Sequence, residues 1–569
     1  MHFIDIAVII LYLLGITFLG IKIGKRIKAS SEFFMPRRFG KGMMMMHAFG
    51  TGTASDQAVV VSSASFKNGI SGIWFQWLWL FCTPFYWLIA PIFRRLRAIT
   101  TADVYALRFG PSVAVLFAII GVIGLSLKIG LMLKGAGALI DAGTDGAVSS
   151  NFAIPTVALL FVIYGAAGGM SAAIITDYIQ GILTIVFSFI LLPFVLQAVG
   201  GINGVRELVN DPSKMSLVAP EKIGVFFIIA FGINSLFLIV SQPFIMGVCS
   251  TGRTEMDGRF GFVVGNLIKR VCTAAWAITG LAALAYFIKE GTIISQVDAD
   301  RVYGQMAKEF LPNIMPGLLG LFIAALLAGV MSSCDSFMIS SSALFTENLY
   351  KPIFKDRNPT HYLKIARIAS IFIVGFGLIF AYSMDGVVSG LKSWLKFGAP
   401  LGIGFWLGLF WRRFNAAGVW VSTLTAYICW WMTTQAFFIS FLKSFSINEK
   451  WGVLRFVNGS HVIYEPYQIT FYLSLAIVAG IIASLTTRKP NTEKIKLYHD
   501  LISTPVNEGE IILKPCTLPE GTVPSDRKKW FLNTSFEICA PSKTSYIGFI
   551  LSWVAVALMV LAFIYIIQP

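Results

Sequence analysis

The chain has 569 residues, of which 56% are hydrophobic and 13% are charged. Soluble globular proteins carry about 25% charged residues, so this composition excludes a soluble fold and predicts an integral membrane protein. Weak strand patterns and long apolar runs favour a helical bundle over an outer-membrane barrel. The formal net charge of +16 is better explained by basic cytoplasmic loops than by nucleic-acid binding.

Runs of about 20 apolar residues predict an all-α polytopic membrane protein with about 14 transmembrane helices. The expected helices lie near residues 5–23, 43–66, 72–93, 113–140, 152–169, 170–199, 223–248, 263–288, 315–345, 364–384, 389–411, 416–441, 468–486 and 546–566. The weakest division is between the fifth and sixth helices, because Gly168 and Gly169 leave almost no loop there. The first run lacks a basic start and a cleavage site, so we expect a permanent helix.

Loop charge predicts the orientation of these helices. Lys25 and Arg26 follow the first expected helix and Arg94 and Arg95 end the third, whereas the stretch 288–312 on the other side is poorer in positive charge. The positive-inside rule therefore places the N-terminus outside, and an even number of crossings places the C-terminus outside as well. We expect a multi-pass protein of the cell membrane, or of the inner membrane if the source is Gram-negative.

The second expected helix carries polar residues where a membrane span should be apolar. Gly50 and Gly52 stand among hydroxyl side chains, and Asp56 follows. Such residues weaken a helix and free backbone carbonyls, which the membrane interior tolerates only where they line a site. Freed carbonyls beside a carboxylate suit a cation such as Na⁺. A Gly-xxx-Gly packing seam would explain the glycines but not Asp56.

The ninth expected helix carries a second group of polar residues. Gly329, Ser332 and Ser333 are spaced i, i+3 and i+4 and therefore share one side of the helix. Asp335 and Ser336 follow about one turn later on the same side. Hydroxyl oxygens are neutral ligands suited to a releasable Na⁺. Membrane serines can instead bond back to their own helix, but the neighbouring carboxylate favours a site.

The other ionisable candidates inside expected spans, where each is costly and is therefore a functional candidate, are Lys128, Lys134, Asp177 and Lys269. Asp177 lies about two turns inside the sixth expected helix, unless it is a helix-end acid that faces the loop. Lys128 lies near the middle of the fourth expected helix and needs a partner. The candidates for that partner are Asp56, Asp335 and an anionic solute.

Three segments together resemble the sodium/solute symporter family, which contains sodium/proline, sodium/glucose, pantothenate and choline carriers. They are the stretch GGMSAAIITDYIQG at 168–181, the stretch MSSCDS at 331–336, and Ala-Ser-Asp at 54–56. With other matching stretches, the resemblance covers nearly the whole chain. It implies secondary active transport, in which one helix bundle rocks against another around a central site.

The resemblance also implies a core of five plus five helices arranged as an inverted repeat, with helices flanking it. The expected division is 1–42 for the first helix and a basic cytoplasmic loop, 43–199 for the first repeat, 223–411 for the second repeat, 416–486 for two flanking helices, 487–545 for a cytoplasmic polar loop and 546–569 for the last helix.

In family members, one Na⁺ lies between the broken second helix and the ninth helix. By position, the resemblance implies backbone carbonyl ligands at Ala54, Gln57 and Gly329 and hydroxyl ligands at Ser332 and Ser333. A second Na⁺ or its release path is expected at Asp56, Asp177, Asp335 and Ser336. Na⁺ is the expected coupling ion, and we expect no other cofactor.

The solute is expected to bind beside these sites. The residues expected to contact it are Phe75, Gln76, Lys128, Gln242 and Lys269. Sugar carriers of the family have an amide at position 56, a Gln near 61 and a Glu near 75, where this chain has Asp56, Val61 and Phe75. This difference favours a solute other than a sugar, and the buried Lys128 favours one that bears a carboxylate.

We therefore expect sodium-coupled import of a small organic solute by alternating access. The alternatives are a sugar or polyol symporter and a proton-coupled carrier of the same fold. A polytopic membrane enzyme is a remote alternative, because the histidines and cysteines are dispersed and form no metal or nucleophile motif. The expected partners are the solute, Na⁺ and the lipid bilayer, with no nucleic acid.

Overall fold

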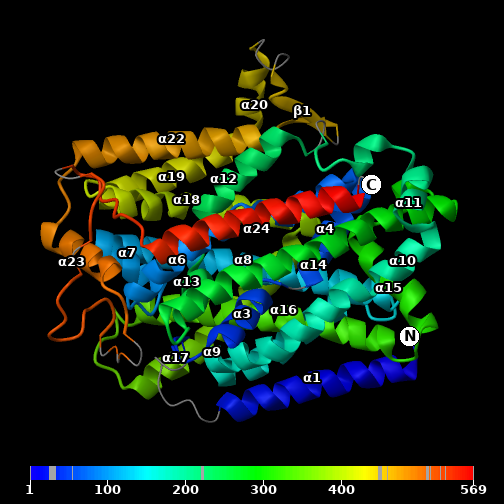
Figure 1. Cartoon of the computed structure of the whole chain (residues 1–569), viewed down its shortest axis with the longest axis horizontal. Coiled ribbons are helices and arrows are strands. Elements are labelled where there is room, and N and C mark those ends of the chain that lie inside the picture. The colour runs from blue at the N-terminus through cyan, green and yellow to red at the C-terminus, as the bar shows by residue number, and fades with distance from the viewer. Residues whose placement is uncertain are drawn as a thin grey trace.

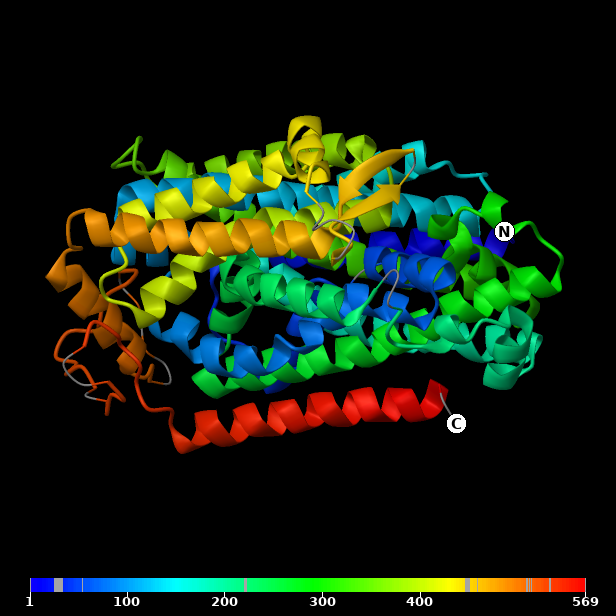
Figure 2. The same ribbon diagram turned by 90° about the horizontal axis from the view of Figure 1, so that it is seen from above.

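In the computed structural model the long helices lie side by side as one bundle (Figure 1; turned by 90° in Figure 2). The structure describes residues 2–24, 34–53, 55–219, 223–445, 451–457, 459–507, 510, 512, 514–525, 527–531 and 534–567. The two ends of the chain lie toward the same end of the bundle, and the polar segment after residue 487 lies at the other (Figure 1). This arrangement agrees with an even number of crossings.

The first half of the chain is helical with short connections. Its elements are α1 (Phe3–Gly24), α3 (Lys41–Gly50), α4 (Ser55–Asn68), η1 (Ile70–Ile73), α5 (Trp74–Trp77), η2 (Leu78–Leu80), α6 (Thr83–Arg95), α7 (Thr101–Phe109), α8 (Pro111–Gly143), α9 (Ser150–Ile190), α10 (Leu192–Val199), α11 (Gly201–Val209) and η3 (Pro212–Met215). A capping box of Thr100 and Asp103 starts α7. Gly110, at a φ of 103°, then separates α7 from Pro111 at the start of α8.

The second half adds the remaining helices and one small sheet. Its elements are α12 (Val225–Ser241), α13 (Pro243–Ser250), α14 (Glu255–Lys289), η4 (Ile294–Gln296), η5 (Ala299–Arg301), α15 (Val302–Phe310), η6 (Leu311–Asn313), α16 (Leu318–Ala343), the π-helix η7 (Leu344–Tyr350), α17 (Pro359–Ser383), α18 (Val387–Phe410), α19 (Ala416–Met432), α20 (Ala436–Lys443), β1 (Leu454–Val457), β2 (Ser460–Ile463), α22 (Glu465–Thr486), α23 (Thr492–Ser503) and α24 (Lys543–Ile567). A capping box of Thr254 and Asp257 starts α14 ahead of the expected residue 263.

Each expected transmembrane range has a helical counterpart. Among the described residues, eight helices are long and apolar enough to cross a membrane, or nine if the bent pair α12 and α13 is one span. The others are broken or shorter, such as α3 with α4 and α19 with α20. The expected total of about 14 spans is therefore consistent with the structure but is not fixed by helix length alone.

Helix α9 supplies both the fifth and the sixth expected spans, although it is helical from Ser150 to Ile190. Near its start, the carbonyl of Asn151 accepts a hydrogen bond from Tyr382 at the end of α17. Met170 packs where α16 ends and α17 begins. Phe187 then contacts Phe322 near the start of α16. The chain therefore reverses direction around Met170, close to the glycines that the sequence identified as the weakest division.

Two of the core helices are broken inside the bundle. The α3 helix ends at Gly50 and α4 begins at Ser55, so the predicted break in the second expected helix is confirmed. The α12 and α13 helices meet at a bend of 63°, where Gln242 adopts an extended backbone and Pro243 starts α13. Pro243 lacks the amide hydrogen that would continue α12. The sequence had predicted one span here.

Helix α16 is the central helix of the bundle, because 94% of the residues in the most apolar 18-residue stretch of Leu318–Tyr350 are buried. It therefore holds the polar residues of the ninth expected helix away from both lipid and water. Outside the bundle, α20 and the antiparallel pair β1–β2 project to one side (Figure 1). This hairpin is the one strand pair among the described residues and is the main departure from an all-α chain.

The polar segment after α22 is bound tightly to one end of the bundle. Arg97, just after α6, pairs with Glu510. Glu255 of α14, which pairs with Arg95 of α6 at 2.7 Å, also accepts a hydrogen bond from the amide of Val506 at 3.1 Å. Glu537 binds Lys529 and Arg412, the latter in the α18–α19 connection. Burial alone would raise the pKa of Glu537, but its bond to Lys529 and the nearby positive charges outweigh burial and lower the pKa. The segment thus connects α6, α14 and α18.

Candidate functional site

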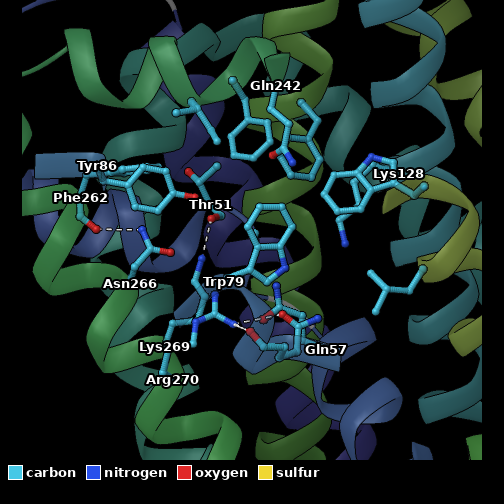
Figure 3. A pocket seen from close by; sticks show the side chains of 17 residues that line it. Thr51, Gln57, Trp79, Tyr86, Lys128, Gln242, Phe262, Asn266, Lys269 and Arg270 are labelled. Atoms are coloured by element: carbon cyan, nitrogen blue, oxygen red, sulfur yellow. Dashed lines mark hydrogen bonds between the residues drawn. The ribbon is translucent and has the colours of Figure 1, made fainter. Parts of the chain in front are cut away.

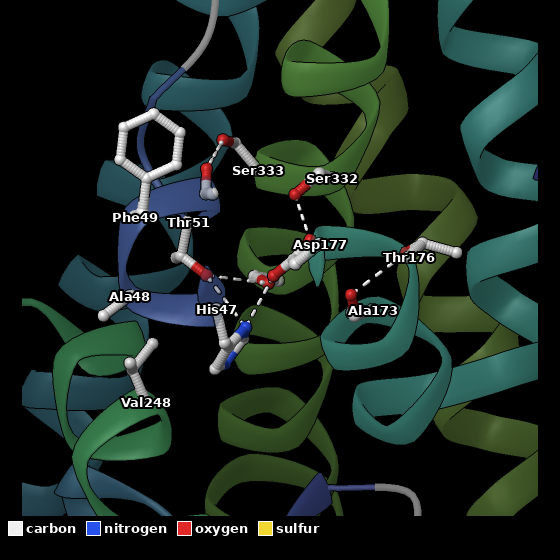
Figure 4. Close-up of polar contacts among 12 residues, drawn as sticks. His47, Ala48, Phe49, Thr51, Ala173, Thr176, Asp177, Val248, Ser332 and Ser333 are labelled. Atoms are coloured by element: carbon white, nitrogen blue, oxygen red, sulfur yellow. Dashed lines mark hydrogen bonds and ion pairs between the residues drawn. The ribbon is translucent and has the colours of Figure 1, made fainter. Parts of the chain in front are cut away.

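The break between α3 and α4 lies directly against α16. Gly52 adopts a φ of 83°, a conformation that glycine reaches without strain. The hydroxyl of Ser333 donates to the carbonyl of Gly50 at 2.9 Å and accepts from the amide of Gly52 at 2.9 Å. One serine of α16 therefore closes the gap that the broken helix leaves in its own hydrogen bonds (Figure 4).

The other described residues that the sequence predicted as sodium ligands lie on the same two elements, α4 and α16. Gln57 stands in the first turn of α4, and Gly329 and Ser332 are buried on α16. Ala54 lies outside the described residues. The structure therefore brings the broken helix and the serine face of α16 into contact, and the binding of Na⁺ by these residues stays a prediction.

Asp177 lies at the centre of a polar cluster and is not a helix-end acid. Its side chain is fully buried, it accepts a hydrogen bond from Ser332, and one of its oxygens lies 2.6 Å from Nδ1 of His47 on α3. Thr51 joins the cluster, with its hydroxyl 3.2 Å from the same nitrogen (Figure 4). Three helices, α3, α9 and α16, therefore meet at one carboxylate.

His47 is a site residue that the sequence did not identify. It stands 130 positions from Asp177, so no local spacing links the two. Its Nε2 is buried with no hydrogen-bond partner among the described residues. A signal was present, since His47 is an isolated polar residue in a methionine-rich run that precedes the glycine break.

The structure separates Asp335 and Ser336, which the sequence grouped with the serines of α16. The hydroxyl of Ser336 lies 3.4 Å from that of Thr51, so Ser336 faces the break. The carboxylate of Asp335 instead lies against Gly165 of α9, where a Cβ would come within 1.7 Å of its oxygen. Asp335 therefore packs against the part of α9 before Met170, where Gly165 has no side chain and leaves space for the carboxylate.

A cavity with about 500 Å³ of space free of atoms lies beside the two helix breaks (Figure 3). It is enclosed by polar side chains and by aromatic rings. Its lining consists of Thr51, Gly52, Gln57, Gln76, Trp79, Tyr86, Lys128, Gln242, Phe244, Ile245, Phe262, Asn266, Lys269, Arg270, Phe337, Leu391 and Trp394. Four of the five residues expected to contact the solute are in this lining, and α4, α8, α13, α14 and α18 all contribute to it.

Phe75 is the expected solute contact that the structure places outside this cavity. Its ring packs edge-on against Phe227 at 5.8 Å and lies under Lys392. The segment from Ile70 to Leu80 alternates between 3₁₀ and α-helical turns, so neighbouring side chains point in directions that a regular helix does not predict. Gln76, the next residue, faces the cavity.

Lys128 finds its partner in Asp56, one of the candidates named from the sequence. Its Nζ lies 2.8 Å from the Asp56 carboxylate, with side-chain exposures of 4% and 0%. The same ammonium lies 4.8 Å from the ring centre of Trp394, within the range of a cation–π contact. The pair therefore connects α8 to α4 immediately after the break.

Two more cations of α14 line the cavity. Lys269 donates to the carbonyls of Thr51 at 3.0 Å and Ala48 at 3.4 Å, so its ammonium stands at the C-terminal end of α3. Arg270 donates to the side-chain oxygen of Gln76 at 3.3 Å. None of the described lining residues is acidic. With Asp56 counted as the counter-charge of Lys128, the cavity keeps an excess of positive charge.

This arrangement can hold small ions and polar solutes by electrostatics and hydrogen bonds. Within the described residues, no group of three or more His, Cys, Asp and Glu side chains is placed to hold a metal ion. The break of α3–α4, the serines of α16 and the cavity form one continuous polar region inside an apolar bundle.

Comparison with known proteins gives consistent matches. A sequence model of the sodium:solute symporter family matches residues 33–426. The osmoregulated proline transporter OpuE of Bacillus subtilis is 24% identical over 457 residues, which cover 77% of this chain and 85% of that one. Sodium/glucose cotransporter 1 of Oryctolagus cuniculus is 21% identical over 597 residues, which cover 93% of this chain and 87% of that one.

Solved transporter structures share the fold. A Na⁺-coupled sialic acid symporter, in a substrate-bound outward-open state, matches with a TM-score of 0.68 at 18% identity, covering 86% of this chain and 99% of that one. A nucleobase-cation-symport-1 family transporter, Mhp1, matches with a TM-score of 0.52 at 12% identity, covering 82% and 98%. The fold is therefore an inverted-repeat transporter fold with two broken helices.

Proposed function

The chain belongs to the sodium:solute symporter family, and from this premise we propose that it imports a small carboxylate-bearing solute together with Na⁺. The coarser part, a multi-pass membrane transporter of a sodium-coupled family, rests on the family match. The finer part, the class of solute, rests on the charge of the cavity.

The observation that carries the solute class is the excess of positive charge beside the helix breaks. Lys269 and Arg270 face the cavity with hydrogen bonds to neutral oxygens only. A carboxylate entering the cavity would replace part of the water that solvates these cations in the open state, and would remove an uncompensated charge. The aromatic rings of Trp79 and Trp394 provide apolar contact for the rest of a small solute.

For the coupling ion, we propose the region between the α3–α4 break and α16. Ser333 already binds the carbonyl of Gly50 and the amide of Gly52, so its hydroxyl is the element that an entering Na⁺ would reorganise. Na⁺ would then join α3–α4 to α16 and favour the state that binds solute. The two ligands assist each other because each favours the same state, and this coupling is reciprocal.

Asp56 takes a different role in this proposal from the one that the sequence suggested. The Lys128 ammonium neutralises it at 2.8 Å, so Asp56 serves as an internal counter-ion and not as a ligand of a second Na⁺. Asp177 remains the acid available to a second cation, because its polar neighbours are the hydroxyl groups of Ser332 and Thr51 and the ring of His47. The membrane potential contributes about 2.3 kcal/mol per charge per 100 mV to each Na⁺ carried.

We also propose the domain division and orientation expected from the sequence. The two repeats occupy about residues 43–199 and 223–411, and each begins with one of the two broken helices. The termini lie outside, and the basic end that carries the polar segment 487–545 lies in the cytoplasm.

The experiment is uptake into proteoliposomes with an inward Na⁺ gradient, compared with an equal choline gradient at fixed pH. Small carboxylates and amino acids are compared with neutral sugars and polyols. We expect uptake of a carboxylate that depends on Na⁺. Uptake of a neutral sugar alone would contradict the proposed solute class.

One observation favours a second candidate, in which a proton replaces Na⁺ as the coupling ion. His47 and Asp177 form a buried pair of titratable groups at the same place. Uptake that continues in choline and follows an imposed pH gradient would identify this alternative.

A further inference from the structure

A second cavity lies at the end of the bundle that carries the polar segment. It has about 850 Å³ of space free of atoms and is partly open to the surroundings. The end of α7, the start of α19 and the chain that joins α22 to α23 enclose it. It is separate from the central cavity, with which it shares no lining residue.

The charge of this cavity is strongly one-sided. Its lining includes Arg108, Arg488, Lys489 and Lys494, and none of the described lining residues is acidic. The starts of α19 and α23 also face it, at Asn415 and Asn491, and helix N-termini carry partial positive charge. Four cations and two helix N-termini thus converge on one cavity, and Glu493 in the first turn of α23 is not among its described lining residues.

Arg108 is the buried member of this group. The residue is 3% exposed, and two of its nitrogens donate to the carbonyls of Gly408 and Trp411 at 3.0 Å. Its remaining nitrogen, Nη1, is buried and has no hydrogen-bond partner among the described residues. A buried guanidinium nitrogen without an acceptor is costly. An anion in the adjoining cavity would supply that acceptor.

The position of the cavity indicates where such an anion comes from. Arg488 and Lys489 follow within three residues of Thr486, the end of α22. Only 33% of the residues in the most apolar 18-residue stretch of α22 are buried in the protein. The exposed side chains of Ile482 and Leu485 lie on the last turns of that helix. The cations therefore stand at headgroup level, next to a helix surface that acyl chains can cover.

We propose that this cavity is a binding site for the phosphate group of an anionic membrane lipid. The phosphate contacts Arg108 at the base of the cavity and Arg488, Lys489 and Lys494 at its mouth, while the acyl chains pack along α22. Bound there, the lipid holds the α22–α23 connection against α7 and α19. The site is independent of the solute and of the coupling ion.

The test measures the thermal unfolding midpoint of the full chain in detergent during titration with a short-chain phosphatidylglycerol. The test variant is Arg488→Ala/Lys489→Ala/Lys494→Ala, which changes exposed residues only. The matched control is Lys355→Ala/Arg357→Ala/Lys364→Ala, which removes the same charge from exposed positions in the α16–α17 connection and the start of α17. Short-chain phosphatidylcholine and inorganic phosphate serve as comparison ligands.

Phosphatidylglycerol is expected to raise the midpoint of the wild type and of the control with the same half-saturating concentration. Each cation near a lipid surface strengthens binding about fivefold, so the triple variant is expected to need about 100-fold more lipid. The single variants Arg488→Ala and Lys494→Ala are each expected to need about fivefold more. These graded variants preserve the test if the triple variant is unstable.

Three results would overturn the proposal. The first is an equal response of the triple variant and the control, which would place binding elsewhere. The second is an equal response to phosphatidylcholine, which would remove the requirement for net negative charge. The third is an equal response to inorganic phosphate, which would show that acyl chains contribute nothing and that the site takes a soluble anion.

Discussion

The buried ion pair of Lys128 and Asp56 gives the sharpest prediction. Lys128→Met removes the ammonium and leaves the Asp56 carboxylate, which has 0% exposure, without a counter-charge. Removing one partner of a buried pair costs about 3–5 kcal/mol, because the remaining charge keeps its desolvation penalty without compensation. Asp56→Asn should be similarly destabilising, since it leaves the ammonium unpaired apart from Trp394.

The double variant separates this explanation from a loss of packing. Lys128→Met combined with Asp56→Asn removes both charges, so we expect it to be more stable than the sum of the two single variants predicts, by about 3 kcal/mol. Lys134→Met is the matched control six positions along the same helix. The Lys134 ammonium is half-buried and donates to the carbonyl of Met384 at 2.8 Å, so its loss should cost only about 1 kcal/mol.

The assay is equilibrium unfolding in mixed detergent micelles, followed by tryptophan fluorescence. The reasoning is refuted if Lys128→Met costs no more than Lys134→Met, or if the two changes at positions 128 and 56 are additive. Either result would mean that the two charges do not form a desolvated pair in the folded protein.

Three further predictions follow from other parts of the structure. Ser333→Ala removes the hydroxyl that binds Gly50 and Gly52 and should raise the Na⁺ concentration for half-maximal uptake at least about tenfold. The control is Ser342→Ala, because the Ser342 hydroxyl bonds to its own helix; it should change that Na⁺ concentration by less than about twofold. Gly52→Ala places a side chain at a φ of 83° and should lower the free energy of unfolding by about 1–2 kcal/mol in the micelle assay; no loss would contradict the described break. Burial lowers the pKa of His499 from 6.5 to about 3, because the folded protein favours the neutral imidazole. The free energy of unfolding is therefore highest above pH 6.5 and decreases as the pH falls, since the unfolded chain then binds a proton that the folded chain does not. Between pH 6.5 and pH 5 the free energy of unfolding should fall by about 2 kcal/mol, and His499→Gln should remove this pH dependence. The measurement is equilibrium unfolding of both proteins at the two pH values.

Much of the central site could be predicted from the sequence, because it consists of residues that are out of place in a membrane span. Gly50, Gly52 and Asp56 indicated a broken helix, and Lys128 indicated a buried partner; both features are present. A polar residue in an apolar run is a strong signal, since hydrocarbon offers it no hydrogen bonds.

The features that the sequence did not provide are those that depend on distant contacts or irregular backbone. His47 and Asp177 meet only when α3 packs against α9, and the orientation of Phe75 depends on alternating 3₁₀ and α turns. Both are effects of tertiary packing, which local patterns do not encode. The bend at Gln242 is different, because Pro243 is a local sign of a break. The apolar residues on both sides of Pro243 led to one expected span, 223–248.

The most direct test of the account is ligand-dependent thermal unfolding of the purified full chain. The midpoint is measured in Na⁺ and in choline, with small carboxylates, amino acids, vitamins, sugars and polyols. A ligand that binds the folded state raises the midpoint by mass action, because it adds about 2.7 kcal/mol to the free energy of unfolding at 100 times its Kd. We predict that a carboxylate-bearing solute stabilises the protein only when Na⁺ is present. Stabilisation by a neutral sugar, or by any solute equally in choline, would contradict the account.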